Sequence, residues 1–146
     1  YPLVGTANGT ADSTAVCPCD VEYRNGDTED PYMFCGTRLN WANASTECRS
    51  YGYELITINN SSEDSWANST ADSYSTQKWW IGLNDRATEG TYVWASGQSA
   101  TYRNWHAGEP NDSGRREDCA QLNRFSDTTW NDEPCGYQFK YVCEAN

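Results

Sequence analysis

Apolar residues recur at helical spacing after Asn40. Four of them fall three or four positions apart and therefore share one face of a helix: Trp41, Ala44, Cys48 and Tyr51. The side chain of Asn40 is suited to accept a hydrogen bond from the first turn of this helix. Gly52 can end it, because glycine readily adopts the left-handed backbone that often follows a helix. The pattern predicts a helix that starts at Trp41 and ends before Gly52.

A second helix is predicted to start at Ser61 or Ser62. Either hydroxyl can cap its amino end, and the next two residues, Glu63 and Asp64, would lie in its first turn. Negative charge in that turn interacts favourably with the positive end of the helix dipole.

Short apolar runs predict strands. The clearest is Lys78–Leu83, whose aromatic and β-branched residues indicate a buried strand. Shorter regular segments are predicted at 55–58, 92–94, 119–122 and 140–143. A hairpin is predicted within residues 17–35, because the Asn25-Gly26 pair near its middle is a common two-residue turn.

Residues 95–118 show no hydrophobic period and contain several glycines and a proline. A loop of this length in a compact domain is usually either functional or disordered. Trp105 lies within it and is expected to anchor it, and Cys119 follows directly. We therefore expect this loop to carry the function.

The length and the charge narrow the class of protein. The chain has 146 residues, enough for one domain with its own core, and a formal charge of −11. This acidity argues against nucleic acids and anionic membranes as partners. No segment approaches the ~20 apolar residues of a membrane span, so we expect no membrane insertion. Residues 1–16 lack the basic start and apolar run of a signal peptide and are expected to form a flexible tail before a domain at 17–146.

The cysteines indicate an oxidising compartment. The chain has seven of them and one histidine, and apart from Cys17 and Cys19 no two lie close together. The paired spacing typical of zinc sites is absent, so disulfide bonds are the expected use. An odd count leaves one cysteine for a free thiol or for a bond between two chains, so a disulfide-linked or non-covalent homo-oligomer is also considered.

Acidic and amide side chains form four short pieces in and around the long loop. They are Asp85–Glu89, Glu109–Asp112, Glu117-Asp118 and Asn131-Asp132. All offer oxygen ligands, and calcium is bound by about six to eight such oxygens. Metals that prefer nitrogen or sulfur would find no suitable ligands there. Single acidic loop residues are mostly solvated, but amides mixed with carboxylates favour a calcium site.

Three motifs then occur in a fixed order: Trp80-Ile81-Gly82-Leu83, Glu109-Pro110-Asn111 and Trp130-Asn131-Asp132. Together with four cysteines, they resemble the C-type lectin domain over residues 35–146. The resemblance implies an α+β, C-type lectin-like fold, in which two helices flank small antiparallel sheets, with a long calcium-binding loop. It also implies two disulfide bonds, Cys48–Cys143 and Cys119–Cys135. In longer members a further pair closes a hairpin, and here Cys17 and Cys19 compete for Cys35.

The resemblance also implies how calcium and sugar are bound. The principal calcium site, which also contacts the sugar, would consist of five residues: Glu109, Asn111, Glu117, Asn131 and Asp132. An accessory calcium position would fall on four acids: Asp85, Glu89, Asp112 and Asp118. A cis peptide bond would precede Pro110. The Glu-Pro-Asn order resembles mannose-type sites, which bind equatorial 3- and 4-hydroxyls, whereas galactose-type members have Gln-Pro-Asp.

The function implied is that of a secreted or extracellular domain that binds glycans bearing mannose-like sugars through calcium. A protein- or ice-binding module on the same fold, without a sugar ligand, is the alternative. An enzyme is not expected, because calcium ligands must stay ionised whereas a catalytic acid needs a raised pKa. A single histidine also leaves little material for a histidine-dependent triad.

Overall fold

The computed structural model describes residues 19–24, 30–122 and 127–145. In these ranges the chain forms two α-helices, a 3-10 turn at Ser113–Arg115 and eight strands. The helices are α1 (Trp41–Ser50) and α2 (Ser61–Tyr74). The strands are β1 (Cys19–Tyr23), β2 (Pro31–Leu39), β3 (Tyr53–Leu55), β4 (Trp79–Asn84), β5 (Val93–Trp94), β6 (Glu117–Leu122), β7 (Trp130–Pro134) and β8 (Phe139–Ala145).

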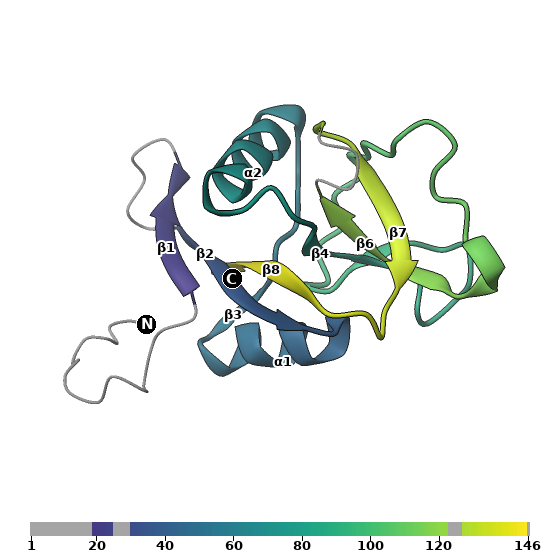
Figure 1. The fold of residues 1–146 in the computed structure, drawn as a ribbon, viewed down its shortest axis with the longest axis horizontal. Coiled ribbons are helices and arrows are strands. Elements are labelled where there is room, and N and C mark those ends of the chain that lie inside the picture. The colour runs from purple at the N-terminus through teal and green to yellow at the C-terminus, as the bar shows by residue number, and fades with distance from the viewer. Residues whose placement is uncertain (1–18, 25–29, 123–126, 146) are drawn as a thin grey trace.

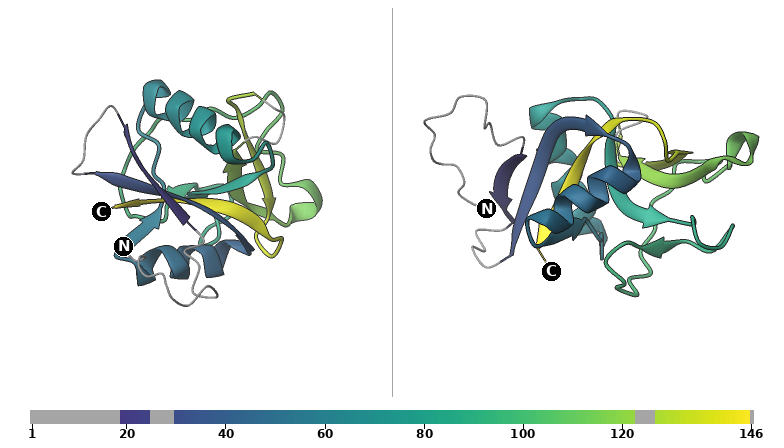
Figure 2. Two further views of the ribbon diagram at one scale, coloured as in Figure 1. Left: turned by 60° about the vertical axis from the view of Figure 1, so that its left-hand side comes forward. Right: turned by 90° about the horizontal axis from the view of Figure 1, so that it is seen from below.

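The strands join in one sheet with the order β1-β2-β8-β4-β6-β7, while β3 pairs with β8 and β5 with β4. All pairs are antiparallel except β4 and β8. The helices α1 and α2 lie on opposite sides of the central strands (Figures 1 and 2). The α+β class and the two flanking helices are therefore confirmed, and the expected small sheets are parts of one connected mixed sheet.

Helix α1 forms as its pattern predicts. The side chain of Asn40 accepts a hydrogen bond from the backbone N–H of Asn43 at 2.8 Å, and Gly52 has a φ of +83°. Trp41, Ala44 and Cys48 are buried along one face. The indole of Trp41 donates to the carbonyl oxygen of Ile81 at 2.9 Å, which fixes the start of the helix against β4.

Helix α2 also starts at Ser61, but its cap is Asn60 rather than a serine. The Asn60 side chain accepts from the backbone N–H of Glu63 at 2.9 Å. The first-turn acids, Glu63 and Asp64, are buried rather than solvated. Glu63 accepts hydrogen bonds from the Tyr32 hydroxyl and the Asn59 backbone, both at 2.8 Å. Glu63 therefore connects α2 to β2 in addition to interacting with the helix dipole. Neither helix in the described part of the chain is long and apolar enough to cross a membrane.

The predicted strand at 55–58 is only partly correct, because β3 ends at Leu55. Beyond it, the Ile56 N–H donates to Val142 on β8, while the Ile56 carbonyl accepts from Gly82 on β4. The segment thus connects two strands instead of extending one. A Cβ atom at Gly82 would lie 2.9 Å from the carbonyl oxygens of both Leu55 and Ile56, so this close approach requires glycine.

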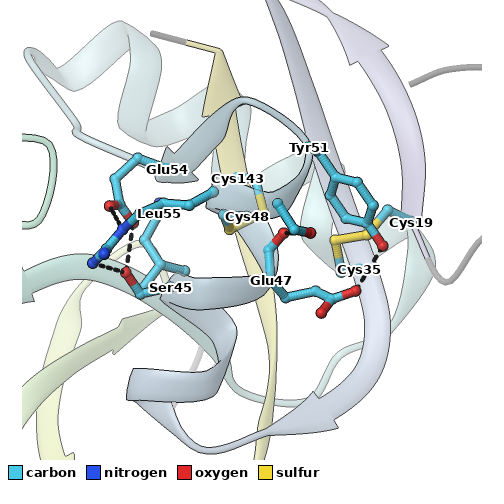
Figure 3. The surroundings of a disulfide bond; sticks show 11 residues. Cys19, Cys35, Ser45, Glu47, Cys48, Tyr51, Glu54, Leu55 and Cys143 are labelled. Atoms are coloured by element: carbon cyan, nitrogen blue, oxygen red, sulfur yellow. Dashed lines mark hydrogen bonds and ion pairs between the residues drawn. A yellow bond between two sulfur atoms is a disulfide. The ribbon is translucent and has the colours of Figure 1, made fainter.

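Three disulfide bonds join cysteines in the described part of the chain: Cys19–Cys35, Cys48–Cys143 and Cys119–Cys135. The first joins β1 to β2, as expected for a hairpin, and assigns Cys19 rather than Cys17 to Cys35; Cys17 lies outside the described residues. The second ties α1 to the sheet across 95 positions of sequence (Figure 3).

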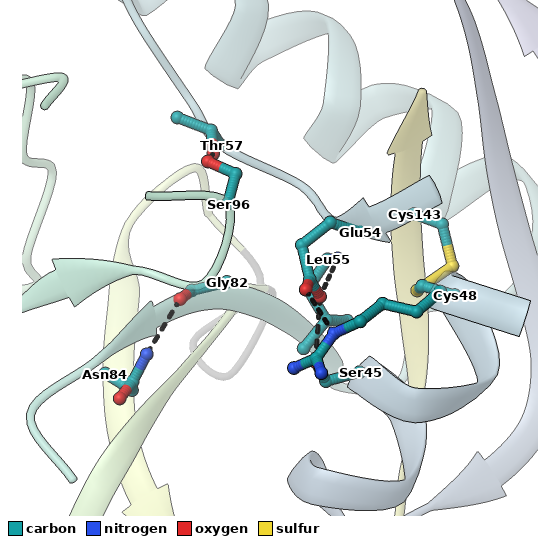
Figure 4. A network of polar contacts seen from close by, with 10 residues as sticks. Ser45, Cys48, Glu54, Leu55, Thr57, Gly82, Asn84, Ser96 and Cys143 are labelled. Atoms are coloured by element: carbon teal, nitrogen blue, oxygen red, sulfur yellow. Dashed lines mark hydrogen bonds and ion pairs between the residues drawn. A yellow bond between two sulfur atoms is a disulfide. The ribbon is translucent and has the colours of Figure 1, made fainter. Parts of the chain in front are cut away.

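Beside the Cys48–Cys143 bond, the buried carboxylate of Glu54 connects α1 to β3. It accepts hydrogen bonds from the Ser45 hydroxyl at 2.8 Å and from the Arg49 guanidinium and the Leu55 N–H, each at 2.7 Å (Figure 4). Because all these donors reach one carboxylate, its burial cost is offset by charge-assisted hydrogen bonds.

Candidate functional site

The long loop is held against the start of β7 at the edge of the sheet. The backbone N–H of Trp130 donates to Asn104 at 2.8 Å, and the N–H of His106 donates to Trp130 at 2.9 Å. The Trp105 ring packs against Trp130 and Tyr92, with centroids 6.0 and 5.0 Å apart. Trp105 therefore anchors the loop, as its position in the sequence predicts.

Carboxylates from the loop, β6 and β7 converge beyond this anchor. Oxygen atoms of Glu109, Glu117 and Asp132 all lie within 4.8 Å of one another. We call these three residues the principal cluster. Asp132 is completely buried, and its two oxygens accept the backbone N–H groups of Asn111 at 3.1 Å and Asp112 at 2.7 Å. These hydrogen bonds fold the loop back onto β7, so that residues far apart in sequence meet.

The two amides predicted for this site lie beside the principal cluster. The peptide bond between Glu109 and Pro110 is cis, and the Asn111 Nδ2 group lies 3.3 Å from Glu109 Oε2. Asn131 is buried, and its Nδ2 group points toward Gln121 and Glu133, at 3.4 Å from each acceptor. The Asn131 N–H group is therefore directed at these two acceptors.

The crowding of carboxylates perturbs their protonation. Burial, a hydrogen bond with Asp132 and the charge of Asp132 together raise the pKa of Glu109 to about 7. Burial and the neighbouring acids also raise the pKa of Glu117, against a hydrogen bond from the Ser113 N–H that lowers it. A divalent cation would relieve the same repulsion by neutralising these charges.

A second group of acids, here called the accessory cluster, consists of Asp85, Glu89 and Asp118, with oxygens again within 4.8 Å of one another. Among the described residues, no donor reaches Oδ1 of Asp85 or Oδ1 of Asp118, although both atoms are buried. Although the Glu89 side chain is exposed, partial loss of hydration and hydrogen bonds to its two partners raise its pKa to about 7. Buried carboxylate oxygens that accept no hydrogen bond are suited to bind a cation, whereas acids of an ordinary surface loop are hydrated.

Asp112 does not belong to the accessory cluster as the structure describes it. Its Oδ1 accepts the backbone N–H of Glu117 at 3.0 Å, and its backbone adopts a left-handed conformation with φ of 45°. Its side chain thus shapes the turn between the two clusters. It still lines, with Asp85 and Glu89, a hollow of about 440 Å³ whose other walls are formed by Gly90, Tyr92, Arg103, Trp105 and Pro110.

The donor chemistry of both clusters fits calcium. Every side chain that converges offers oxygen, and carboxylates are mixed with the amides of Asn111 and Asn131 beside the principal cluster. This is the ligand class that calcium prefers, whereas zinc and copper prefer nitrogen and sulfur.

One residue at the site was missed by the sequence. Asp64 on α2 was given only a helix-dipole role, yet it is 1% exposed and contacts the Trp130 indole, directly before Asn131. The mostly polar sequence around it gives no signal of this, because its partners lie about 40 or more positions away in the sequence.

Comparison with known proteins identifies the family. The sequence profile of the Lectin C-type domain matches residues 37–145. C-type lectin domain family 4 member M from Hylobates lar is 34% identical over 131 residues, which cover 88% of this chain and 31% of that protein. The chain thus spans about a third of the length of this curated relative.

Solved structures agree. The C-type lectin CEL-I from Cucumaria echinata has a TM-score of 0.78 and 30% identity, over 88% of this chain and 96% of that one. Herring type II antifreeze protein has a TM-score of 0.74 and 28% identity, over 88% of this chain and 97% of that one. The profile covers most of the sequence, and the fold agrees in both comparisons. The chain therefore belongs to the C-type lectin domain family.

Proposed function

We propose that this domain binds carbohydrate through a calcium ion held by Glu109, Asn111, Glu117, Asn131 and Asp132. Membership of a lectin family makes it a binding domain rather than an enzyme. The observation that carries the proposal is the principal cluster, in which three carboxylates from three separate segments lie within 4.8 Å of one another. Without a cation, this arrangement costs electrostatic energy, and a ligand would explain why it is built.

Bound calcium would offer coordination positions at which two neighbouring sugar hydroxyls replace water. The protein's part is to complete the hydrogen bonds of those hydroxyls. A carboxylate accepts the hydroxyl proton, and an amide N–H donates to a hydroxyl lone pair. Glu109 and Asn111 form one such pair, since their side chains lie side by side. Glu117 supplies a second carboxylate, and Asn131 is proposed to offer its amide oxygen to the calcium ion, because its Nδ2 group is directed at Gln121 and Glu133.

Within this proposal, mannose-type sugars are the ligands. The order Glu109-Pro110-Asn111 places the acceptor before the donor, and this polarity suits equatorial 3- and 4-hydroxyls in the family that the motif resembles. Glycans bearing mannose-like sugars are therefore the proposed partners. The accessory cluster is proposed to hold a further calcium ion, with Asp112, which lines the same hollow, as a fourth ligand.

The proposed setting is extracellular. Three disulfide bonds within the described residues are typical of proteins that mature in an oxidising compartment. We propose that the lectin domain spans residues 17–146, with residues 1–16 as a tail.

The proposal is tested by calorimetric titration with calcium and then with methyl mannoside, and by thermal unfolding with and without EDTA. Calcium at a few hundred-fold excess over its dissociation constant should stabilise the fold by about 3–4 kcal/mol. Asp132→Asn should weaken both ligands. Glu63→Gln, which removes a buried acid on α2 whose hydrogen bonds go to Tyr32 and Asn59, is the matched control and should bind both ligands as wild type does. A melting temperature and a sugar affinity that EDTA leaves unchanged would refute calcium-dependent binding.

A protein- or ice-binding role remains the second candidate, because the chain is similar to herring type II antifreeze protein over most of both chains. Thermal hysteresis measured on the calcium-loaded protein separates the two functions. Hysteresis together with the absence of any chelator-sensitive signal on a glycan array would favour the second.

A further inference from the structure

A buried carboxylate on α2 reaches across to two of the three segments that carry the principal cluster, the long loop and β7. Asp64 is 1% exposed. Its Oδ1 accepts a hydrogen bond from the Trp130 indole at 3.0 Å. Its Oδ2 accepts from the Asn104 amide at 2.7 Å and from the Tyr102 hydroxyl at 3.1 Å. All three donors come from outside α2, and none is within 35 positions of Asp64 in the sequence.

The donors lie two to seven positions before the acids of the cluster. Trp130 precedes Asn131 and Asp132 in β7. On the loop side, Asn104 leads to His106, whose carbonyl oxygen accepts the backbone N–H of Glu109 at 2.8 Å. One carboxylate is therefore bonded to both segments, a few residues upstream of the acids on each.

A further contact makes the arrangement rigid. The Asn104 amide that donates to Asp64 also donates to the backbone carbonyl of Thr128 at 2.6 Å. The loop and the start of β7 are thus joined directly as well as through Asp64. An ionised carboxylate can accept from all three donors, because both of its oxygens have acceptor sites and neither carries a proton. An amide in its position would turn its own N–H group toward one of them.

We propose that Asp64 is a positioning residue that holds the Glu109 segment and the Asp132 segment against each other and thereby sets the calcium affinity of the principal cluster. The claim about calcium affinity rests on the proposed function, whereas the claim that Asp64 holds the two segments together does not. Residues that orient metal ligands without touching the metal typically change its affinity by about 10- to 100-fold when replaced.

The neighbouring residue supplies a matched control. Glu63 is also buried on α2, and its bonds go to Tyr32 and Asn59, which belong to β2 and to the turn before α2. Asp64→Asn and Glu63→Gln each remove one buried negative charge at adjacent positions with little change in shape. A general loss of stability, or a change in the overall electrostatic field, should affect the two variants alike.

The test uses two measurements on the whole chain. The first is hydrogen–deuterium exchange in EDTA, read at residues 102–112 and 130–132. The second is calorimetric titration with calcium alone, well below each variant's melting temperature. We expect Asp64→Asn to exchange faster in both segments and to weaken calcium binding by about tenfold or more. Glu63→Gln should leave both quantities close to wild type, even if its melting temperature falls.

The outcomes are distinguishable. Equal calcium affinity and equal exchange in Asp64→Asn and Glu63→Gln would overturn the proposal, whatever the melting temperatures. A wild-type chain that binds no calcium would contradict the proposed function, while exchange in EDTA would still decide whether Asp64 holds the segments. If Asp64→Asn does not fold, Tyr102→Phe removes one half-buried donor, and unchanged exchange at 102–112 in that variant would overturn the proposal instead.

Discussion

Replacing Glu144 with glutamine should make the domain more stable at neutral pH and leave its stability at low pH almost unchanged. Glu144 lies on β8, and its Oε1 accepts the backbone N–H of Thr57 at 3.0 Å. Burial first, and then the charges of Glu63 and Asp30, raise the pKa of this carboxyl to about 7, against the opposing effects of the Thr57 hydrogen bond and Arg24. Glutamine keeps the acceptor for Thr57 and removes the charge.

The size of the effect follows from this pKa. In the unfolded chain the carboxyl ionises near its ordinary value of 4.5, whereas in the folded chain it stays protonated until about pH 7. Below pH 4.5 both states are protonated, so the group has no influence. As the pH rises from 4.5 to 7, the carboxyl loses its proton in the unfolded state but keeps it in the folded state, so the unfolded state gains stability relative to the folded state. The difference in pKa corresponds to about 3 kcal/mol of lost stability at pH 7–8, and to less than about 1 kcal/mol at pH 5.

The assay is urea unfolding of wild type and Glu144→Gln across pH 4–8, at one fixed calcium concentration. The free energy of unfolding of the two proteins should be nearly equal at pH 4 and diverge toward pH 8, with the variant more stable. Comparison of the pair at each pH removes the contribution of every other titrating group. A difference that is the same at all pH values, or that has the opposite sign at pH 8, would refute a raised pKa at this position.

Three further predictions concern packing, cross-linking and specificity. Gly82→Ala should destabilise the domain by about 1–3 kcal/mol, because the new Cβ meets two backbone carbonyl oxygens; unchanged denaturant midpoints would contradict this close approach. Joint replacement of Cys48 and Cys143 by alanine should cost about 4–5 kcal/mol, since their bond closes most of the chain into one loop; a variant with the melting temperature of wild type would argue against it. Exchanging Glu109→Gln with Asn111→Asp should weaken mannose binding by about 1–3 kcal/mol at saturating calcium and shift preference toward galactose; full mannose affinity would show that these two residues do not set specificity.

The sequence predicted the elements whose signal is local. Helix α1 follows from its apolar spacing and from Asn40, and β4 follows from its run of aromatic and branched residues. Strand β7 was not predicted. Its sequence, Trp130–Pro134, is mostly polar, yet Asn131 and Asp132 are buried in it. Their burial depends on contacts with β6 for Asn131 and with the loop for Asp132, which no pattern within five residues can reveal.

The same distinction applies to the candidate site. Residue type and order identified the three acids of the principal cluster, and the structure brings them together. Asp112 resembled its neighbours in composition, but its carboxylate caps the Glu117 N–H instead of joining the accessory cluster. Asp64 could not be found at all, because an acid in the first turn of a helix has a sufficient local explanation. For Asp64 the decisive partners are side chains that only the tertiary structure brings near it.

The position of β8 in the sheet has a consequence for biosynthesis. Although it is the last described strand in the chain, it lies inside the sheet, paired with β2, β3 and β4. While the ribosome is still making residues before Phe139, these three strands have no partner at this place, and the apolar side chains between them are exposed. Domains whose contacts join distant parts of the chain fold slowly and are prone to aggregate while incomplete. The nascent chain should therefore depend on chaperones until its final strand has emerged.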